Sequence, residues 1–117
     1  MAHNFKQLKI WQRAMDLTAL VHEFCKALPK DERNNLTDQI NRCSVSIPFN
    51  IAEGSGKRTN KHFAEYISTS LTSCFELETQ LLICERRNYG NKTVRDKSLK
   101  EVVEIQKMIF AFRETLN

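Results

Sequence analysis

Residues 63–84 read FAEYISTSLTSCFELETQLLIC and contain the most regular apolar pattern in the chain. Apolar or small residues recur here in steps of four and three, at Phe63, Ile67, Ser70, Cys74, Leu77, Leu81 and Cys84. Side chains at this spacing share one face of an α-helix. The sequence therefore predicts a long helix that a cap at Thr59 or Asn60 begins and that residues 88–91, Asn-Tyr-Gly-Asn, end.

The same spacing predicts three further helices around this one. The first runs from about Phe5 to Leu28, before Pro29, with a stripe of Leu8, Trp11, Met15, Thr18, Val21, Cys25 and Leu28. The second carries Leu36, Ile40, Cys43, Ile47 and Ile51 and closes at residues 54–56, Gly-Ser-Gly. Pro48 has no N–H for the Ser44 carbonyl, so a kink or interruption is expected there. The fourth carries Val102, Ile105, Ile109, Phe112 and Leu116, and Thr93 with Asp96 resembles its capping box.

Size and composition favour a single all-α domain that spans residues 1–117. A chain of 117 residues and 13.7 kDa has room for one core. Three glycines and two prolines leave few turns for a many-stranded fold. Because short connections join antiparallel neighbours, the expected topology is an antiparallel up-down-up-down four-helix bundle.

The chain shows no sign of a membrane segment or a disulfide framework. No apolar run approaches membrane-spanning length, and the first residues, Met1 to Lys6, lack the apolar stretch of a secretory signal. The four cysteines all fall within helical patterns, which favours reduced thiols in the core over disulfides in loops. We therefore expect a cytoplasmic protein.

No motif predicts catalysis, a metal or a cofactor. Residues 54–59, Gly-Ser-Gly-Lys-Arg-Thr, resemble a phosphate-binding loop, but Arg58 occupies the Ser/Thr position and a helix precedes the loop. His22 and Cys25 form at most half of a zinc site. Glu76 and Glu78 point about 200° apart on a helix, so they are not a carboxylate pair.

Basic residues gather toward the ends of the expected helices, and the formal net charge is +4. One cluster comprises Lys57, Arg58 and Lys61, and the other comprises Arg86, Arg87, Lys92 and Arg95 with Lys97 and Lys100. Between Arg86 and Lys100 the only acidic residue is Asp96. These clusters are either a polyanion-binding surface or ordinary solvated helix ends, where the dipole favours cations at C-termini.

The last two helices carry more apolar side chains than one seam needs. Leu71, Phe75, Leu82, Leu99, Val103 and Phe110 lie off the main stripes. They form either a wide core-facing stripe or a contact surface for self-association, and Leu71, Phe75, Leu82, Val103 and Phe110 are the candidate interface residues.

Residues 39–54, QINRCSVSIPFNIAEG, closely resemble the signature of the bacterial four-helix bundle family found in intervening sequences of 23S ribosomal RNA genes. The most specific positions are Ser46, Asn50, Glu53 and Gly54. Further matches are Phe5, Leu8, Trp11, Ala14, Leu28, Pro29, Glu32, Ser73, Glu76, Leu77 and Glu78. One departure from the family pattern is Ser70-x-Thr72, where the family has Ala-x-Gly.

This resemblance implies an antiparallel four-helix bundle that assembles as a homopentameric ring. It extends to the accessory variability determinant proteins of diversity-generating retroelements, which are basic, bind nucleic acid and associate with a reverse transcriptase. It implies no catalytic residues. We therefore expect a non-catalytic, self-associating bundle that binds RNA or DNA through its basic ends, with the 46–54 motif serving structure. The alternative is a scaffold that recruits a protein and has no affinity for nucleic acid.

Overall fold

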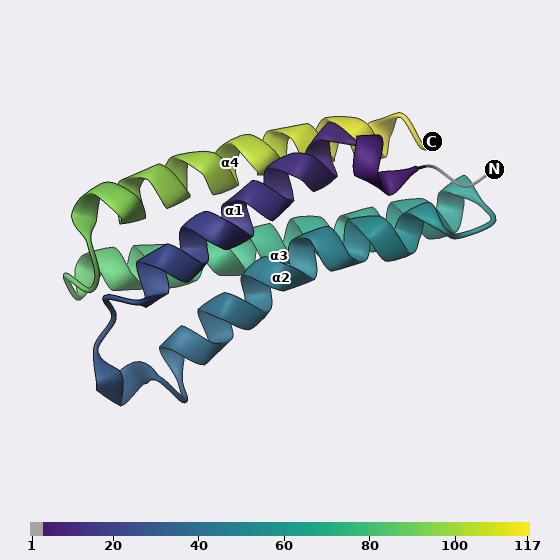
Figure 1. The fold of residues 1–117 in the computed structure, drawn as a ribbon. Coiled ribbons are helices and arrows are strands. Elements are labelled where there is room, and N and C mark those ends of the chain that lie inside the picture. Colours follow the sequence, from purple (N-terminus) through teal and green to yellow (C-terminus); the bar gives the residue numbers. More distant parts are fainter. Residues whose placement is uncertain (1–3) are drawn as a thin grey trace.

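The computed structural model describes residues 4–117, and the regular structure within them is entirely helical (Figure 1). The elements are the 3-10 helices η1 (Phe5–Gln7) and η2 (Lys30–Glu32) and the α-helices α1 (Lys9–Cys25), α2 (Leu36–Ser55), α3 (Asn60–Arg86) and α4 (Lys92–Glu114). The predictions of an all-α fold and of four long helices are confirmed. Residues 1–3 of the predicted domain, and with them the start of the sequence, lie outside the described residues.

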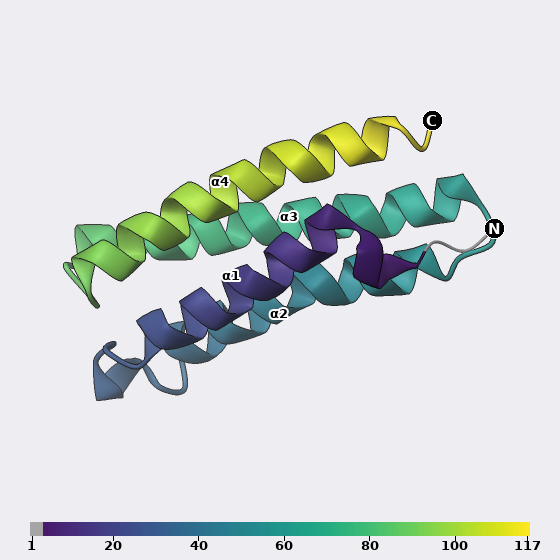
Figure 2. The same ribbon diagram turned by 45° about the horizontal axis from the view of Figure 1, so that its top comes forward.

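The four α-helices pack in a closed square. α1 packs beside α2 and α4, and α3 packs beside the same two helices, so α1 lies diagonally across from α3, and α2 from α4. Figure 2 shows α1 running alongside α2, and α4 alongside α3. The α1–α2 and α3–α4 connections lie at one end of the molecule, and the α2–α3 turn lies at the other with both chain ends (Figure 1). The face formed by α1 and α2 is therefore opposite the face formed by α3 and α4.

The seam predicted on α3 forms the centre of the core. All seven residues of its heptad pattern, Phe63, Ile67, Ser70, Cys74, Leu77, Leu81 and Cys84, are buried. Ser70 Oγ donates to the Ile47 carbonyl of α2 at 2.9 Å, so its hydroxyl is satisfied inside the core. This position, where the sequence departs from the family pattern, thus lies directly against α2. Thr59 Oγ1 accepts the His62 N–H at 3.1 Å, which confirms one of the two predicted caps.

The predicted phase of the first helix was wrong. The residues that α1 buries are Ile10, Ala14, Leu17, Val21, Phe24 and Cys25. Met15, which was placed on the core stripe, is 43% exposed. Both stripes have helical spacing and overlap at Val21 and Cys25, so periodicity alone did not separate them. α1 also ends at Cys25, and a turn rather than helix carries the buried Leu28 to Pro29.

α2 continues through Pro48 without interruption, and its C-cap is Gly56, within the predicted stop at residues 54–56. The predicted start of the fourth helix differs. α4 begins at Lys92 because Asn91 Oδ1 accepts the Val94 N–H at 3.0 Å, and this cap replaces the predicted capping box of Thr93 and Asp96.

Candidate nucleic-acid interface

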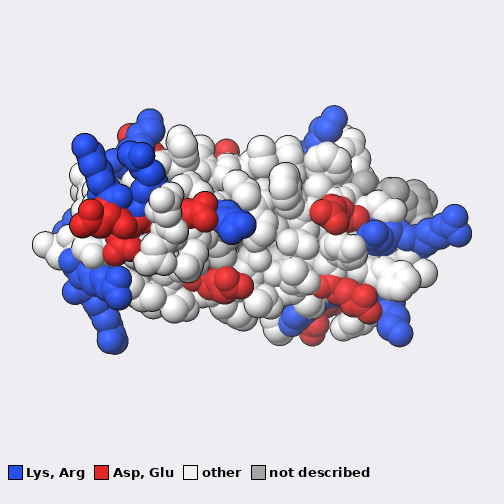
Figure 3. Space-filling view, turned by 90° about the horizontal axis from the view of Figure 1, so that it is seen from below, with Lys and Arg blue, Asp and Glu red and all other residues white. Residues whose placement is uncertain are grey.

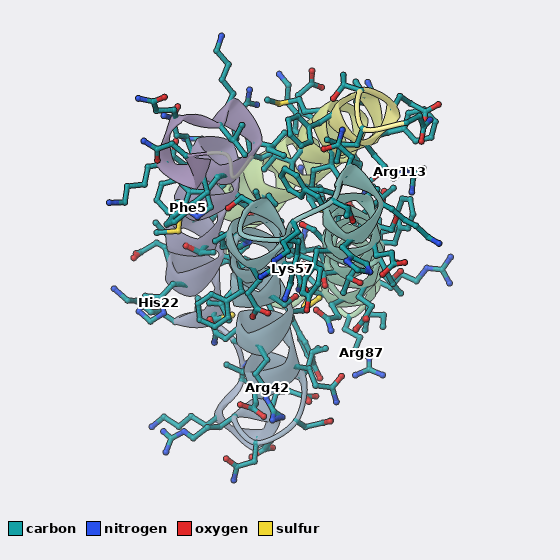
Figure 4. The ribbon with its side chains drawn as sticks, turned by 90° about the vertical axis from the view of Figure 1, so that its right-hand side faces the viewer. Phe5, His22, Arg42, Lys57, Arg87 and Arg113 are labelled. Carbon is teal, nitrogen blue, oxygen red and sulfur yellow. The ribbon has the colours of Figure 1, made fainter. Side chains whose placement is uncertain are left out.

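The α2–α3 turn presents Lys57, Arg58 and Lys61 at one end of the bundle, and all three are exposed. Among residues 4–117, no carboxylate lies within salt-bridge distance of any of them. Lys57 Nζ lies 4.9 Å from the centre of the Tyr66 ring, a cation–π contact that leaves its charge unneutralised. Figure 4 looks along the bundle from this end, where Lys57 is labelled. The turn therefore carries three cations that phosphate groups could reach.

The other predicted basic cluster lies at the opposite end and is partly neutralised. Lys92 Nζ lies 2.7 Å from Asp96 Oδ2, and this hydrogen bond lowers the pKa of Asp96 below its usual value. Arg87 Nη1 lies 3.8 Å from Glu32 Oε2, a residue of η2 that is distant in sequence. Arg86 is exposed and has no salt bridge within the described residues. Figure 3 shows carboxylates among the cations at this end.

Arg95 is not a surface residue, and its assignment to the nucleic-acid interface is corrected. It is 4% exposed, and its Nη1 donates to the Tyr89 carbonyl at 2.9 Å. The guanidinium thereby fixes the α3–α4 turn. Arg95 occupies the buried stripe of α4, which comprises Arg95, Ser98, Val102, Ile105 and Ile109. Arg95 is spaced three and four residues from the apolar residues of this stripe, which indicated burial. The prediction of a surface position rested only on its charge.

The candidate interface residues on α3 and α4 separate into core and surface. Leu71 is 7% exposed and belongs to the core, and Val103 is half-buried against it. Phe75, Leu82 and Phe110 are 52%, 41% and 51% exposed. We call the surface formed by these three residues the α3/α4 patch. A hollow of about 310 Å³ lies between Phe75 and Phe110, floored by Leu71 and edged by Gln106 and Lys107.

A second apolar surface, absent from the predictions, lies on the opposite face. A groove of about 470 Å³ runs between α1 and α2 and is lined by side chains that include Phe5, Trp11, Met15, Val45, Pro48 and Phe49. We call it the α1/α2 groove. Phe49 at its edge is 65% exposed, more than any other large apolar side chain of the described residues. Phe49 lies off the apolar stripe of the second helix, which indicates that its ring is exposed. The predictions did not use this position.

Two residues of the family motif, Ser46 and Gly54, lie in the seam between α2 and α3, and a third, Asn50, bonds within α2. Ser46 Oγ lies 2.7 Å from Ser73 Oγ, and the backbone of Gly54 lies against Phe63 and Tyr66. Asn50 Nδ2 donates to the Ser46 carbonyl at 2.7 Å, not to the Ser44 carbonyl that Pro48 leaves without its helical donor. Glu53 is exposed on the last turn of α2 and takes no part in the seam.

The Asn50 hydrogen bond provides a test of the structural interpretation of the motif. Asn50→Ala should lower the free energy of unfolding by about 0.5–1.5 kcal/mol, the usual net contribution of one intramolecular hydrogen bond. Urea denaturation measures the change. Unaltered stability together with lost binding to a nucleic acid would show instead that Asn50 is a recognition residue.

The described residues offer no activated nucleophile or metal-ligand cluster. All four cysteines are free and buried, and burial raises the pKa of Cys25 and Cys84 to about 11 and that of Cys43 and Cys74 to about 12. These thiols are protonated, and hence weakly nucleophilic, at neutral pH. Among residues 4–117, no three His, Cys, Asp or Glu side chains gather as metal ligands would. None of the helices in the same range has the length and apolar character needed to cross a membrane.

A comparison with protein families shows to which family the chain belongs. Residues 6–111 match the model of the 23S rRNA-intervening sequence protein family. The chain belongs to this family. The resemblance drawn from residues 39–54 is thereby confirmed.

Comparison with solved structures supports the same fold. The crystal structure of a protein with unknown function from the S23 ribosomal protein family of Bacteroides thetaiotaomicron superposes with a TM-score of 0.80. It is 20% identical in sequence, and the alignment covers 89% of this chain and 97% of that one. A search of curated proteins finds no match. The chain thus shares its fold with a protein whose own function is unknown.

Proposed function

We propose that this protein is a non-catalytic, self-associating bundle that binds RNA or DNA through the basic surface at its α2–α3 turn. In this proposal the up-down-up-down bundles assemble in the cytoplasm as a ring, with five copies as the family resemblance implies. The ring acts as an accessory factor to a nucleic-acid-processing protein such as a reverse transcriptase.

The observation that carries the proposal is the set of three cations without carboxylate partners at the α2–α3 turn. Lys57 and Arg58 lie on a short turn whose ends are fixed by α2 and by the Thr59 cap of α3, and Lys61 lies in the first turn of α3. An ordered turn loses little conformational entropy when it binds. Self-association repeats the cluster in every copy, and several linked weak sites bind a polyanion more tightly than one.

A salt titration tests the proposal. Replacing Lys57, Arg58 and Lys61 by Gln should weaken binding at least tenfold at low salt. It should also reduce the slope of log K against log salt by up to about 0.9 for each lost contact to duplex phosphate. The matched control replaces Arg86, Arg87 and Lys92 by Gln, which removes the same charge from the opposite end. Because two of those three cations already face carboxylates, we expect a smaller effect.

The two basic ends and the scaffold alternative give different results in this experiment. Equal-length single-stranded and duplex RNA and DNA are titrated with the intact oligomer, whose mass is checked by light scattering. A larger loss in the control variant would move the binding surface to the Arg86–Lys92 end. No binding to any of the four probes at low salt would overturn the proposal.

A protein scaffold is the second candidate, and the two exposed apolar surfaces favour it. The α1/α2 groove and the α3/α4 patch together expose six large apolar side chains on a small chain, and such surfaces mark protein contacts. The scaffold would retain self-association and lack salt-dependent nucleic-acid binding, so the same titration separates the two functions.

A further inference from the structure

The exposed apolar side chains fall on two opposite faces of the bundle. Of the large apolar residues that remain exposed within residues 4–117, Met15, Val45 and Phe49 border the α1/α2 groove, and Phe75, Leu82 and Phe110 form the α3/α4 patch. In the square packing, the face formed by α1 and α2 lies opposite the face formed by α3 and α4. Exposed apolar side chains that gather on one surface mark protein contacts, and here they gather on two surfaces.

The two faces have complementary shapes. Phe49 projects from α2 with 65% of its surface exposed. The α3/α4 patch has a hollow of about 310 Å³ between Phe75 and Phe110. A phenyl ring placed there would meet two further aromatic rings and the apolar floor at Leu71, an arrangement that aromatic pairs favour.

The charges next to these surfaces are complementary as well. Glu53 lies one helical turn beyond Phe49 on α2, and Arg113 lies one turn beyond Phe110 on α4. Both turns lead toward the same end of the bundle, because α2 and α4 both end there (Figure 1). Within the described residues neither Glu53 nor Arg113 has a salt-bridge partner in its own copy. Arg113 donates to Ser68 Oγ at 3.2 Å and lies over the Phe110 ring.

We propose that Phe49 of one copy inserts between Phe75 and Phe110 of a second copy that points the same way, with Glu53 opposite Arg113. The proposal deepens the self-association of the proposed function and rests on it. Because the contact joins two different faces, each copy keeps one free surface of each kind, and assembly continues until a ring closes. A two-fold dimer through one face would leave the other apolar surface exposed in both copies.

Complementing variants test this pairing. Phe49→Glu removes the inserting ring and keeps the α3/α4 patch, whereas Phe110→Glu does the reverse. Both side chains are exposed, so the variants should fold. Light scattering after gel filtration should give a wild-type mass several times 13.7 kDa and should give a monomer for each variant alone. An equimolar mixture should give a one-to-one heterodimer, because one intact interface remains.

Further variants complete the experiment. Ala111→Glu is the matched control, since Ala111 is exposed next to Phe110 but lies on the α1 side beside Leu8 and Ile10, and it should assemble as the wild type does. Reversing one charge, by Glu53→Arg or by Arg113→Glu, should weaken assembly because it places like charges opposite each other, whereas the double reversal should restore it.

The failures are distinguishable. A wild-type monomer at all concentrations would overturn self-association itself and leave the salt titration to decide nucleic-acid binding. A Phe49→Glu variant that still assembles while Phe110→Glu does not would overturn the pairing in favour of a two-fold contact through the α3/α4 patch. Single charge reversals at Glu53 and Arg113 that leave assembly unchanged would overturn the proposed orientation.

Discussion

Gly54→Ala is expected to lower the free energy of unfolding by about 1–3 kcal/mol, the cost of overfilling a packed core. A Cβ at Gly54 would lie 2.7 Å from Tyr66 Cβ and 2.8 Å from Phe63 Cδ1. The Phe63 ring can rotate away, but Tyr66 Cβ is fixed to the backbone of α3. The methyl group would therefore push α2 and α3 apart along the seam that holds the motif.

Gly56→Ala is the matched control for this prediction. A Cβ there would meet only the Glu53 carbonyl, at 3.6 Å, which is an ordinary contact. Both substitutions add one methyl group near the end of α2. Helix propensity favours alanine at Gly54, which lies inside the helix, so a loss of stability there reflects the close contact with α3. Urea denaturation should show a clear loss for Gly54→Ala and little change for Gly56→Ala. Equal stabilities would mean that the close approach of α3 does not make glycine necessary at position 54.

The α3 seam was predictable because its pattern had no competitor. Phe63 to Cys84 keep one four-three register over the whole stretch, and shifting that register by one residue would bury Glu76 or Glu78. α1 lacked this constraint. Leu17 and Thr18, or Ala14 and Met15, serve a helical stripe equally well by spacing, and only the positions of α2 and α4 decide which set is buried.

The candidate site was predictable only as far as local sequence determines charge. Counting from Arg86 to Lys100 gave a strongly basic end, because Glu32 approaches Arg87 only after the chain has folded. Lys57, Arg58 and Lys61 are exposed, as expected from their position at a short connection between two helices. Arg95 is buried because helical periodicity places it on the core-facing stripe, and periodicity applies to a cation as it does to a leucine.

The unpredicted α1/α2 groove follows from the error in α1. Once Trp11 and Met15 had been assigned to the core, the side of the helix that carries them was not considered as a surface. The exposed Val45 and Phe49 then had no partner across from them. The correct phase of α1 places Met15 and Trp11 beside these residues and creates the groove.

Gly90→Ala is expected to have the largest effect of the single substitutions, about 2–4 kcal/mol, because it combines two costs. Gly90 has a φ of +79°, in the left-handed region that disfavours a side chain. A Cβ there would also lie 2.5 Å from Cε1 and 2.9 Å from Cζ of Phe24, a fully buried ring of α1. The α3–α4 turn is thus packed directly onto the core at the end of the bundle that Arg95 fixes.

A double-mutant cycle with Phe24→Leu separates the two costs. Leucine lacks the Cε1 and Cζ atoms that the new methyl group would meet, so it removes the overlap and leaves the backbone strain. In the Phe24→Leu background, Gly90→Ala should therefore cost only about 1–2 kcal/mol, the penalty of a left-handed residue. Phe24→Leu alone sets the baseline, and urea denaturation of all four proteins gives the coupling energy. An identical cost of Gly90→Ala in both backgrounds would show that the turn does not pack on Phe24 and that backbone conformation alone makes glycine necessary there.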